Sequence, residues 1–298
     1  MKRRTFTVSV AGPLGAAVEA ALGAGQGALV ARGAVYVDGK RAVDPQRALR
    51  PGQVVSAVLS EGGADTLEPK PLPPPLDVLF EDAALVVVSK PSGVLAQPSP
   101  GEVGSSLLDQ VSAHLGHPAG LVHRLDKETS GVTVFGKTKA ATSALAGHFR
   151  EGRARKLYVA VTPAFEPTQG TVALPLSRDP SRPGRWRASA KHQGVSAHTN
   201  YRQLGGRDGL VAVLLQPLTG RTHQLRAHLT ALGAPIVGDR FYGGVPAFEG
   251  TPVRCLLHAL ELALPEGTFR APPPADLAKA LQVLGVDLGR IEGGARVG

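Results

Sequence analysis

The 298-residue sequence contains a single cysteine, Cys255, and no apolar run that approaches the length of a membrane span. One cysteine excludes an internal disulfide framework and is typical of a protein from a reducing compartment. Cys255 and His258 form an isolated pair without a second pair at ligand spacing, so we expect no metal site. The residues after the basic start are too few and too polar for a secretory signal. We therefore expect a cytoplasmic protein with no membrane partner.

Acidic residues are scarcer than basic ones. The 24 Asp and Glu residues stand against 33 Lys and Arg, which gives a net charge of +9 and favours an anionic partner, with nucleic acid first. Five basic residues surround Trp186, and four more precede Tyr158. They are Arg178, Arg182, Arg185, Arg187 and Lys191, then Arg150, Arg153, Arg155 and Lys156. Basic side chains around an aromatic ring suit single-stranded or looped RNA, so we expect Arg185 and Arg187 to bind it. The alternative is a charged surface that serves solubility.

The chain divides at a proline-rich stretch. Residues 61–75 show no apolar periodicity and are rich in proline near their end, which is typical of a semi-extended linker. We expect a small unit at 1–60, a large domain at 76–285 and a loose tail at 286–298.

The small unit reads as two short helices followed by strands. Leu14, Val18 and Leu22 have helical spacing, and Asp38-Gly39 lies between two strands as the dipeptide that a tight hairpin turn favours. Residues 29–39 and 50–55 resemble a small α/β RNA-binding module first described in a ribosomal protein.

The large domain interleaves strand and helix patterns. Residues 85–88, 132–135, 157–161, 195–201 and 210–216 are strand candidates, and residues 107–115, 141–149 and 223–232 are helical ones. No βαβ unit repeats, which favours an α+β domain on a mixed, mainly antiparallel sheet.

One stretch places a carboxylate among cations. In His123-Arg124-Leu125-Asp126-Lys127-Glu128-Thr129-Ser130-Gly131, the basic residues can hold a polyanion and the small residues turn the backbone. By itself this is either an acidic nucleophile presented to a phosphate-bearing substrate or a solvated charged loop.

Four further segments accompany this stretch in a fixed order. They are Lys90-Pro91-Ser92-Gly93-Val94, Arg155-Lys156-Leu157-Tyr158-Val159-Ala160, residues 219–229 and residues 233–243. Together the five segments resemble the RluA-type pseudouridine synthases over residues 76–265. The resemblance implies an enzyme that isomerises uridine to pseudouridine in RNA without a metal or other cofactor. It further implies a ribosomal RNA target of the large subunit, with transfer RNA as the alternative. We expect a monomer.

The resemblance also assigns catalytic residues. Asp126 matches the family's catalytic aspartate, and Arg221 matches the arginine that forms an ion pair with it. Tyr158 matches the tyrosine that lies against the uracil and takes part in the late proton transfer. Without the resemblance, Arg221 is also explained as a phosphate-binding arginine before a helix, and Tyr158 as a core aromatic residue.

Five more residues are expected to bind the substrate. Arg124 matches the residue that helps displace the target nucleotide, while Lys90 and Lys156 are expected along the pocket or the phosphate path. His123 and Leu225 lie inside the motifs and are expected to line the same site, although His123 is equally explained as a structural hydrogen-bonding residue.

Two other functions remain open from the sequence. An RNA-binding assembly factor could keep the scaffold without the chemistry, although it would need none of the three catalytic residues. An RNA glycosidase would cut the same bond, but such hydrolysis generally uses two carboxylates, and Glu128 is the only near partner of Asp126. Whether Asp126 attacks the ribose, attacks the base or removes a ribose proton also remains open.

Overall fold

The computed structural model describes residues 2–31, 33–59, 75–99, 106–191 and 193–290. The chain forms two compact units, one of residues 1–75 and 95–117, the other of residues 76–94 and 118–298. Residues 95–117, which we predicted within the large domain, group with the first unit. The predicted linker lies outside the described residues except for Pro75. None of the described helices is long and apolar enough to span a membrane.

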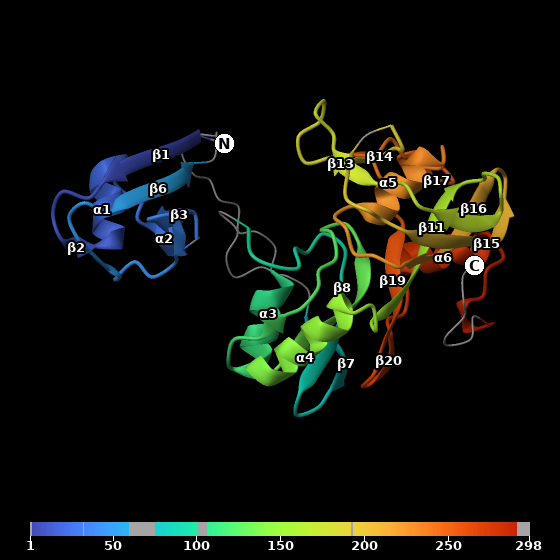
Figure 1. The fold of residues 1–298 in the computed structure, drawn as a ribbon, viewed down its shortest axis with the longest axis horizontal. Coiled ribbons are helices and arrows are strands. Elements are labelled where there is room, and N and C mark those ends of the chain that lie inside the picture. Colours follow the sequence, from blue (N-terminus) through green and yellow to red (C-terminus); the bar gives the residue numbers. More distant parts are fainter. Residues whose placement is uncertain (1, 32, 60–74, 100–105, 192, 291–298) are drawn as a thin grey trace. The chain divides into compact units, whose positions relative to one another are not determined.

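In the first unit, the part before the linker combines two short helices with a small antiparallel sheet (Figure 1). The sheet has the order β1 (Lys2–Thr7), β6 (Val54–Leu59), β3 (Val35–Val37) and β4 (Lys40–Ala42), with β2 (Gly12–Pro13) paired to β5 (Ala48–Leu49). The helices are α1 (Leu14–Leu22) and α2 (Ala28–Ala31). Asp38 and Gly39 both have positive φ, at 50° and 77°, as the predicted hairpin turn requires.

Helix α3 (Leu107–Leu115) also belongs to the first unit. Ser106 caps its first turn, because the Ser106 hydroxyl accepts from the Asp109 backbone N–H while the Asp109 carboxylate accepts from the Ser106 backbone N–H. Ser106 and Asp109 therefore form a capping box at the start of α3.

The second unit contains a ten-stranded sheet. Its main path runs β12 (Gln169–Val172), β15 (Thr199–Arg207), β16 (Leu210–Pro217), β11 (Arg155–Pro163), β19 (Leu257–Leu264), β10 (Ser130–Gly136), β8 (Leu85–Lys90) and β7 (Asp77–Glu81). β20 (Gly267–Arg270) pairs with β19, and β9 (Gly120–Leu121) pairs with β10. Within the described strands only β10 and β19 pair in parallel, so the sheet is mixed and mainly antiparallel, as predicted.

Helices and short ribbons complete this unit. They are α4 (Lys139–Arg150), α5 (Gln224–Ala231), α6 (Ala275–Val283), the 3₁₀ turn Leu288–Arg290, and the ribbons β13 (Leu176–Arg178) with β14 (Trp186–Ala188) and β17 (Ala247–Phe248) with β18 (Thr251–Pro252). The predicted strand at 195–201 begins only at Thr199, since Val195 makes an isolated bridge to Leu176. Val286 and Leu288 pack against the apolar cluster around α6, so the predicted loose tail begins with packed residues.

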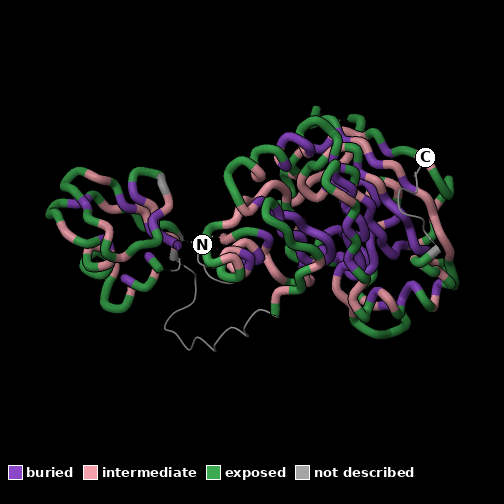
Figure 2. The backbone as a smooth tube through the Cα atoms, turned by 90° about the horizontal axis from the view of Figure 1, so that it is seen from below, coloured by how far each residue is buried: buried purple, intermediate pink, exposed green. Residues whose placement is uncertain are grey.

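The centre of the sheet is the most deeply buried part of the second unit (Figure 2). Every residue of β10 is buried. Gly131 has a φ of 120°, and a β-carbon at this position would collide with the Ala259 carbonyl of the parallel neighbour β19. A glycine is therefore required where the loop containing Asp126 enters the sheet.

Candidate active site

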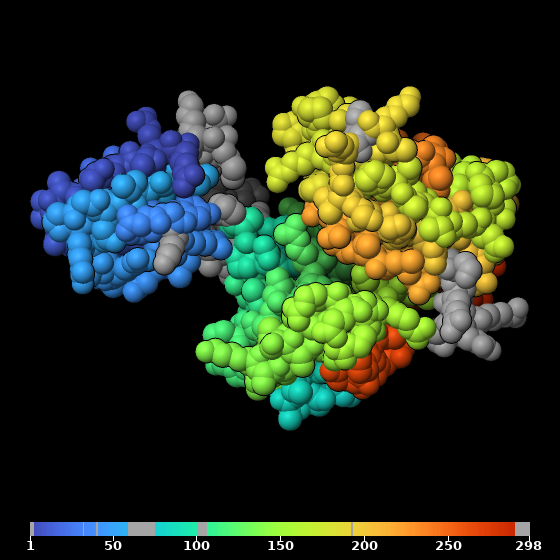
Figure 3. Space-filling model, viewed as in Figure 1, coloured from blue at the N-terminus to red at the C-terminus, as the bar shows by residue number. Residues whose placement is uncertain are grey.

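Three segments of the second unit surround one cavity of about 710 Å³. They are the loop 121–129 before β10, the segment 149–158 from the end of α4 into β11, and the segment 217–226 from the end of β16 into α5. Figure 3 shows the molecule hollowed between the green segment around α4 and the yellow-to-orange segment around α5. The cavity brings together seven predicted residues: His123, Arg124, Asp126, Lys156, Tyr158, Arg221 and Leu225.

Backbone contacts hold the Asp126 loop in place. The Gly93 N–H donates to the Lys127 carbonyl at 2.8 Å, and the Ser92 hydroxyl donates to the Glu128 carbonyl at 2.8 Å. Within the loop, the Thr129 N–H donates to the Asp126 carbonyl at 3.1 Å. The segment Lys90-Pro91-Ser92-Gly93-Val94 therefore supports the loop through hydrogen bonds to its carbonyls.

Lys90 itself does not line the cavity, which corrects the prediction that it contributes to the pocket or the phosphate path. Its side chain is fully buried, and its Nζ donates to the carbonyls of Pro91, Val94 and Lys127 at 2.9, 2.6 and 3.0 Å. Burial lowers the pKa of Lys90 to about 7. Because strand β8 ends inside the core, the ammonium meets backbone carbonyls before it can reach solvent.

Arg226 provides the ion pair of Asp126. Arg226 Nη1 lies 3.1 Å from Asp126 Oδ2, while its Nε and Nη2 donate to both carboxylate oxygens of Asp239 at 2.7 and 2.9 Å. Arg226 is 7% exposed and Asp239 is 2% exposed. The bidentate pair with Asp239 fixes the plane of the guanidinium and leaves one N–H for Asp126.

The predicted ion pair between Arg221 and Asp126 is therefore corrected. Arg221 lies in the turn before α5, is exposed, and donates from Nε to the Ser196 carbonyl at 3.1 Å. Arg226 comes five residues later, in the first turn of α5, where every residue from Gln224 to Leu229 is buried. A sequence signal for Arg226 did exist, because it lies among Leu225, Ala227 and Leu229, and a buried arginine needs a carboxylate partner.

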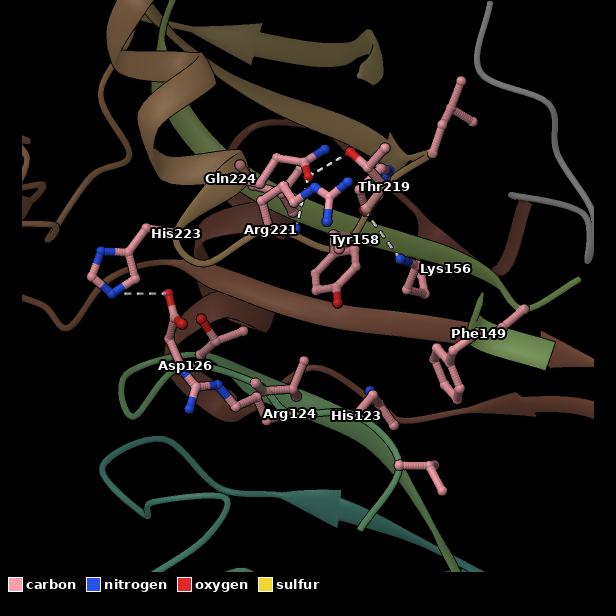
Figure 4. A pocket seen from close by; sticks show the side chains of 18 of the residues that line it. His123, Arg124, Asp126, Phe149, Lys156, Tyr158, Thr219, Arg221, His223 and Gln224 are labelled. Carbon is pink, nitrogen blue, oxygen red and sulfur yellow. Dashed lines mark hydrogen bonds and ion pairs between the residues drawn. The ribbon is translucent and has the colours of Figure 1, made fainter. Parts of the chain in front are cut away.

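Tyr158 points from β11 toward the loop that contains Asp126 and Arg124 (Figure 4). The register between β11 and β19 shifts between Leu157 and Tyr158, a bulge of the kind that re-aims a side chain beside a site. Burial and the charge of Asp126 raise the pKa of Tyr158 above its ordinary value. The phenol therefore keeps its proton at neutral pH.

The end of the cavity away from Asp126 contains His123 and Lys156 (Figure 4). His123 Nε2 accepts from the Val134 N–H at 3.1 Å, and its ring stacks on Phe149 at 4.5 Å. Burial lowers the pKa of His123 to about 3, so the ring is neutral. Lys156 Nζ donates to the Thr219 carbonyl at 3.2 Å, and burial lowers its pKa to about 8.

Arg185 and Arg187 lie on the β13–β14 hairpin and not among the described residues that line the cavity. Arg187 Nε donates to the Ser177 hydroxyl at 3.4 Å. Arg185 Nε lies 3.7 Å from Asp179 Oδ2, and its guanidinium lies 5.1 Å from the centre of the Tyr242 ring. The two arginines thus belong to a basic surface beside α5.

His223 is the other residue near Asp126 that sequence reasoning left without a role. Its Nε2 lies 3.8 Å from Asp126 Oδ2, and its Nδ1 lies 3.0 Å from the Tyr242 hydroxyl. Tyr242 belongs to the last of the five segments, residues 233–243. Neither contact could be read from spacing, because the two residues come from different segments.

The comparisons with known proteins agree on one family. The profile described as RNA pseudouridylate synthase matches residues 84–231, which include all the described lining residues except Leu257. An uncharacterized RNA pseudouridine synthase of Aquifex aeolicus is 35% identical over 226 residues, 72% of this chain and 70% of that protein. The dual-specificity RNA pseudouridine synthase RluA of Escherichia coli K12 is 41% identical over 212 residues, 68% of this chain and 95% of that protein.

Two human solved structures have a similar fold. RNA pseudouridylate synthase domain containing 4 aligns with a TM-score of 0.60 and 28% identity, over 71% of this chain and 94% of that one. RNA pseudouridylate synthase domain containing 1 aligns with a TM-score of 0.58 and 27% identity, over 71% of this chain and 95% of that one.

Proposed function

Because the chain belongs to the RluA-type RNA pseudouridine synthases, we propose that it isomerises specific uridines of RNA with Asp126 as the acting carboxylate. The observation that carries the proposal is that Asp126 is the only carboxylate among the described residues that line the cavity. Glycoside hydrolysis generally uses two carboxylates, so a cavity with one suits a reaction that cleaves the base–ribose bond and re-forms it. Glu128 does not join the described lining.

The contacts of the site suit the roles that we propose. Arg226 donates to one oxygen of Asp126 and holds the carboxylate in place for attack on the ribose, attack on the base or removal of a ribose proton. The protonated phenol of Tyr158 can donate a hydrogen bond to an extruded uracil and take part in moving the proton of its carbon. Leu225 and Leu257 provide an apolar wall for the base, and Arg124 is exposed beside it.

We further propose that the target is ribosomal RNA of the large subunit, with transfer RNA as the alternative. The match to RluA covers 95% of that protein but 68% of this chain, which leaves about a third of the chain without a counterpart there. The resemblance of residues 29–39 and 50–55 to a ribosomal RNA-binding module supports a larger folded RNA. We place the protein in the cytoplasm as a monomer.

The test is tritium release from RNA labelled on the uracil carbon that becomes bonded to ribose. Unmodified transcripts of large-subunit ribosomal RNA and of transfer RNA are compared, with the wild type and Asp126→Asn. We expect release from the ribosomal transcript with the base retained, and no turnover by Asp126→Asn although RNA affinity changes by less than about tenfold. Because the amide keeps the shape of the side chain, a loss of turnover reports the missing charge.

Each of the other outcomes contradicts one part of the proposal: the reaction, the target RNA or the role of Asp126. Free uracil would indicate a glycosidase, and release only from transfer RNA would correct the target. Normal turnover by Asp126→Asn would remove Asp126 from the chemistry.

A further inference from the structure

One tyrosine connects the basic hairpin with the histidine that faces Asp126. The side chain of Tyr242 is buried, and its hydroxyl accepts from the Trp186 backbone N–H at 3.0 Å. The same hydroxyl lies 3.0 Å from His223 Nδ1. The chain of contacts runs from β14 through Tyr242 and His223 to Asp126 Oδ2.

These contacts fit one arrangement of protons on His223. The Trp186 N–H occupies one lone pair of the Tyr242 oxygen, and in this arrangement the hydroxyl donates its proton to His223 Nδ1. A neutral imidazole that accepts at Nδ1 carries its proton on Nε2. The N–H of Nε2 then faces the Asp126 carboxylate, at a distance too long for a hydrogen bond but close enough for electrostatic attraction.

The surroundings favour the neutral form of this ring. Burial lowers the pKa of His223, and the nearby cations Arg226 and Arg124 act in the same direction against Asp126 and Asp239. His223 is also held at a φ of 55°, a left-handed conformation that is costly for a residue with a β-carbon.

The charge of His223 matters because of where it would act. Arg226 and His223 both approach Oδ2 of Asp126, whereas Oδ1 has no hydrogen bond or ion pair within the described residues. A protonated His223 would form a second ion pair with the carboxylate and oppose any reaction that consumes its negative charge. A neutral His223 leaves the carboxylate with a single cationic partner.

The ring of Tyr242 also contacts an arginine from the hairpin region and the arginine that binds Asp126. The guanidinium of Arg185, from the hairpin region, lies 5.1 Å from the ring centre, and that of Arg226 lies 4.8 Å from it. The Tyr242 backbone N–H donates to Asp239 Oδ1 at 3.2 Å. The tyrosine is thus fixed to the same buried network that holds Asp126.

We infer that Tyr242 and His223 are positioning residues for Asp126: the Tyr242 hydroxyl, itself held by the hairpin backbone, keeps His223 neutral with the Nε2 proton toward the carboxylate. This inference rests on the proposed role of Asp126.

The first test is the pH dependence of single-turnover tritium release by Tyr242→Phe. Without the hydroxyl, Nδ1 is free to take a proton. We therefore expect the midpoint of the acid limb of the pH–rate profile to rise by about half a pH unit to one pH unit. Tyr201→Phe is the matched control, because Tyr201 is also buried but lies on β15 away from the described cavity lining. A wild-type pH profile for Tyr242→Phe, or an equal shift for Tyr201→Phe, would overturn the inference.

A double variant separates this effect from general damage. His223→Gln removes the titrating ring, so adding Tyr242→Phe to it should move the acid limb no further. If Tyr242→Phe shifts the profile equally in both backgrounds, Tyr242 acts by another route and the inference fails.

A measurement on the unaltered chain complements the variants. Nitrogen-15 NMR of histidine-labelled protein, with the His223 signals assigned through His223→Gln, should show Nε2 protonated and Nδ1 unprotonated at neutral pH. A proton on Nδ1 would overturn the inference even if every tyrosine variant failed to fold. The NMR result does not depend on turnover, so failure of the proposed role of Asp126 in the asparagine variant is distinguishable from failure here.

Discussion

The cavity and the basic hairpin use arginine in opposite surroundings. Arg226 is 7% exposed and binds two carboxylates, one of them bidentately. Arg185 lies on the hairpin side with its guanidinium near one carboxylate and against the ring of Tyr242. A buried arginine with fixed partners can define the position of a reacting group, whereas a partly buried one with a single long ion pair keeps N–H groups for a phosphate. The chemistry and the binding of RNA are thus assigned to different kinds of site in the same unit.

Exchanging Arg226 for lysine is the strongest way to break this comparison. Lysine keeps the charge but cannot bind Asp239 bidentately and reach Asp126 together, so we expect Arg226→Lys to lower kcat about 100-fold or more. Single-turnover tritium release measures the effect. Arg221→Lys is the matched control and should lower kcat less than about tenfold. A larger loss for Arg221→Lys would restore the assignment that the sequence resemblance implied.

The buried support of the Asp126 loop makes a prediction about stability. Below pH 7 the folded state must hold Lys90 charged in the core, and this penalty shrinks as pH rises toward the ordinary lysine pKa. The unfolded chain binds more protons in this range, so the free energy of unfolding should rise with pH between about 7 and 10. Lys90 contributes at most about 1.4 kcal/mol per pH unit.

Urea unfolding of the wild type and of Lys90→Met at several pH values measures this slope. Lys90→Met should lose the contribution, whereas Lys137→Met, which removes a partly buried lysine paired with Glu81, should keep it. Equal slopes for the wild type and Lys90→Met would show that Lys90 does not titrate in this range.

The same contrast explains what the sequence could predict. The local pattern was sufficient for the Asp38-Gly39 turn, because such a turn depends on short-range geometry. The lack of a repeating βαβ unit was sufficient for the sheet class. The cavity segments were identified through the resemblance, since their motifs keep their order along the chain. All but Lys90 of the residues predicted in the catalytic motifs line the cavity.

The errors concern contacts between segments. The choice between Arg221 and Arg226 depends on how the turn before α5 and the first turn of α5 lie against the Asp126 loop, and the burial of Lys90 depends on where β8 ends within the sheet. Neither is encoded in local spacing. Both errors concern buried cations, which are rare: Lys90 supports the loop from within the core, and Arg226 rather than the exposed Arg221 holds the carboxylate.

The hairpin offers the mildest test, on affinity. Replacing Arg185 and Arg187 together by alanine should weaken RNA binding about tenfold at low salt, because two phosphate contacts are lost. The plot of log Kd against log salt should become less steep by about 1.4 if both arginines touch a single strand. Filter binding across a salt series measures both quantities. Arg207→Ala, which removes an exposed arginine beside Asp208 at the end of β15, is the matched control and should keep the wild-type slope.

An unchanged slope in the double variant would remove the hairpin from the RNA interface. A fall in kcat that exceeds the fall in affinity would instead assign Arg185 to the cavity network through Tyr242, and so erase the distinction between the two regions.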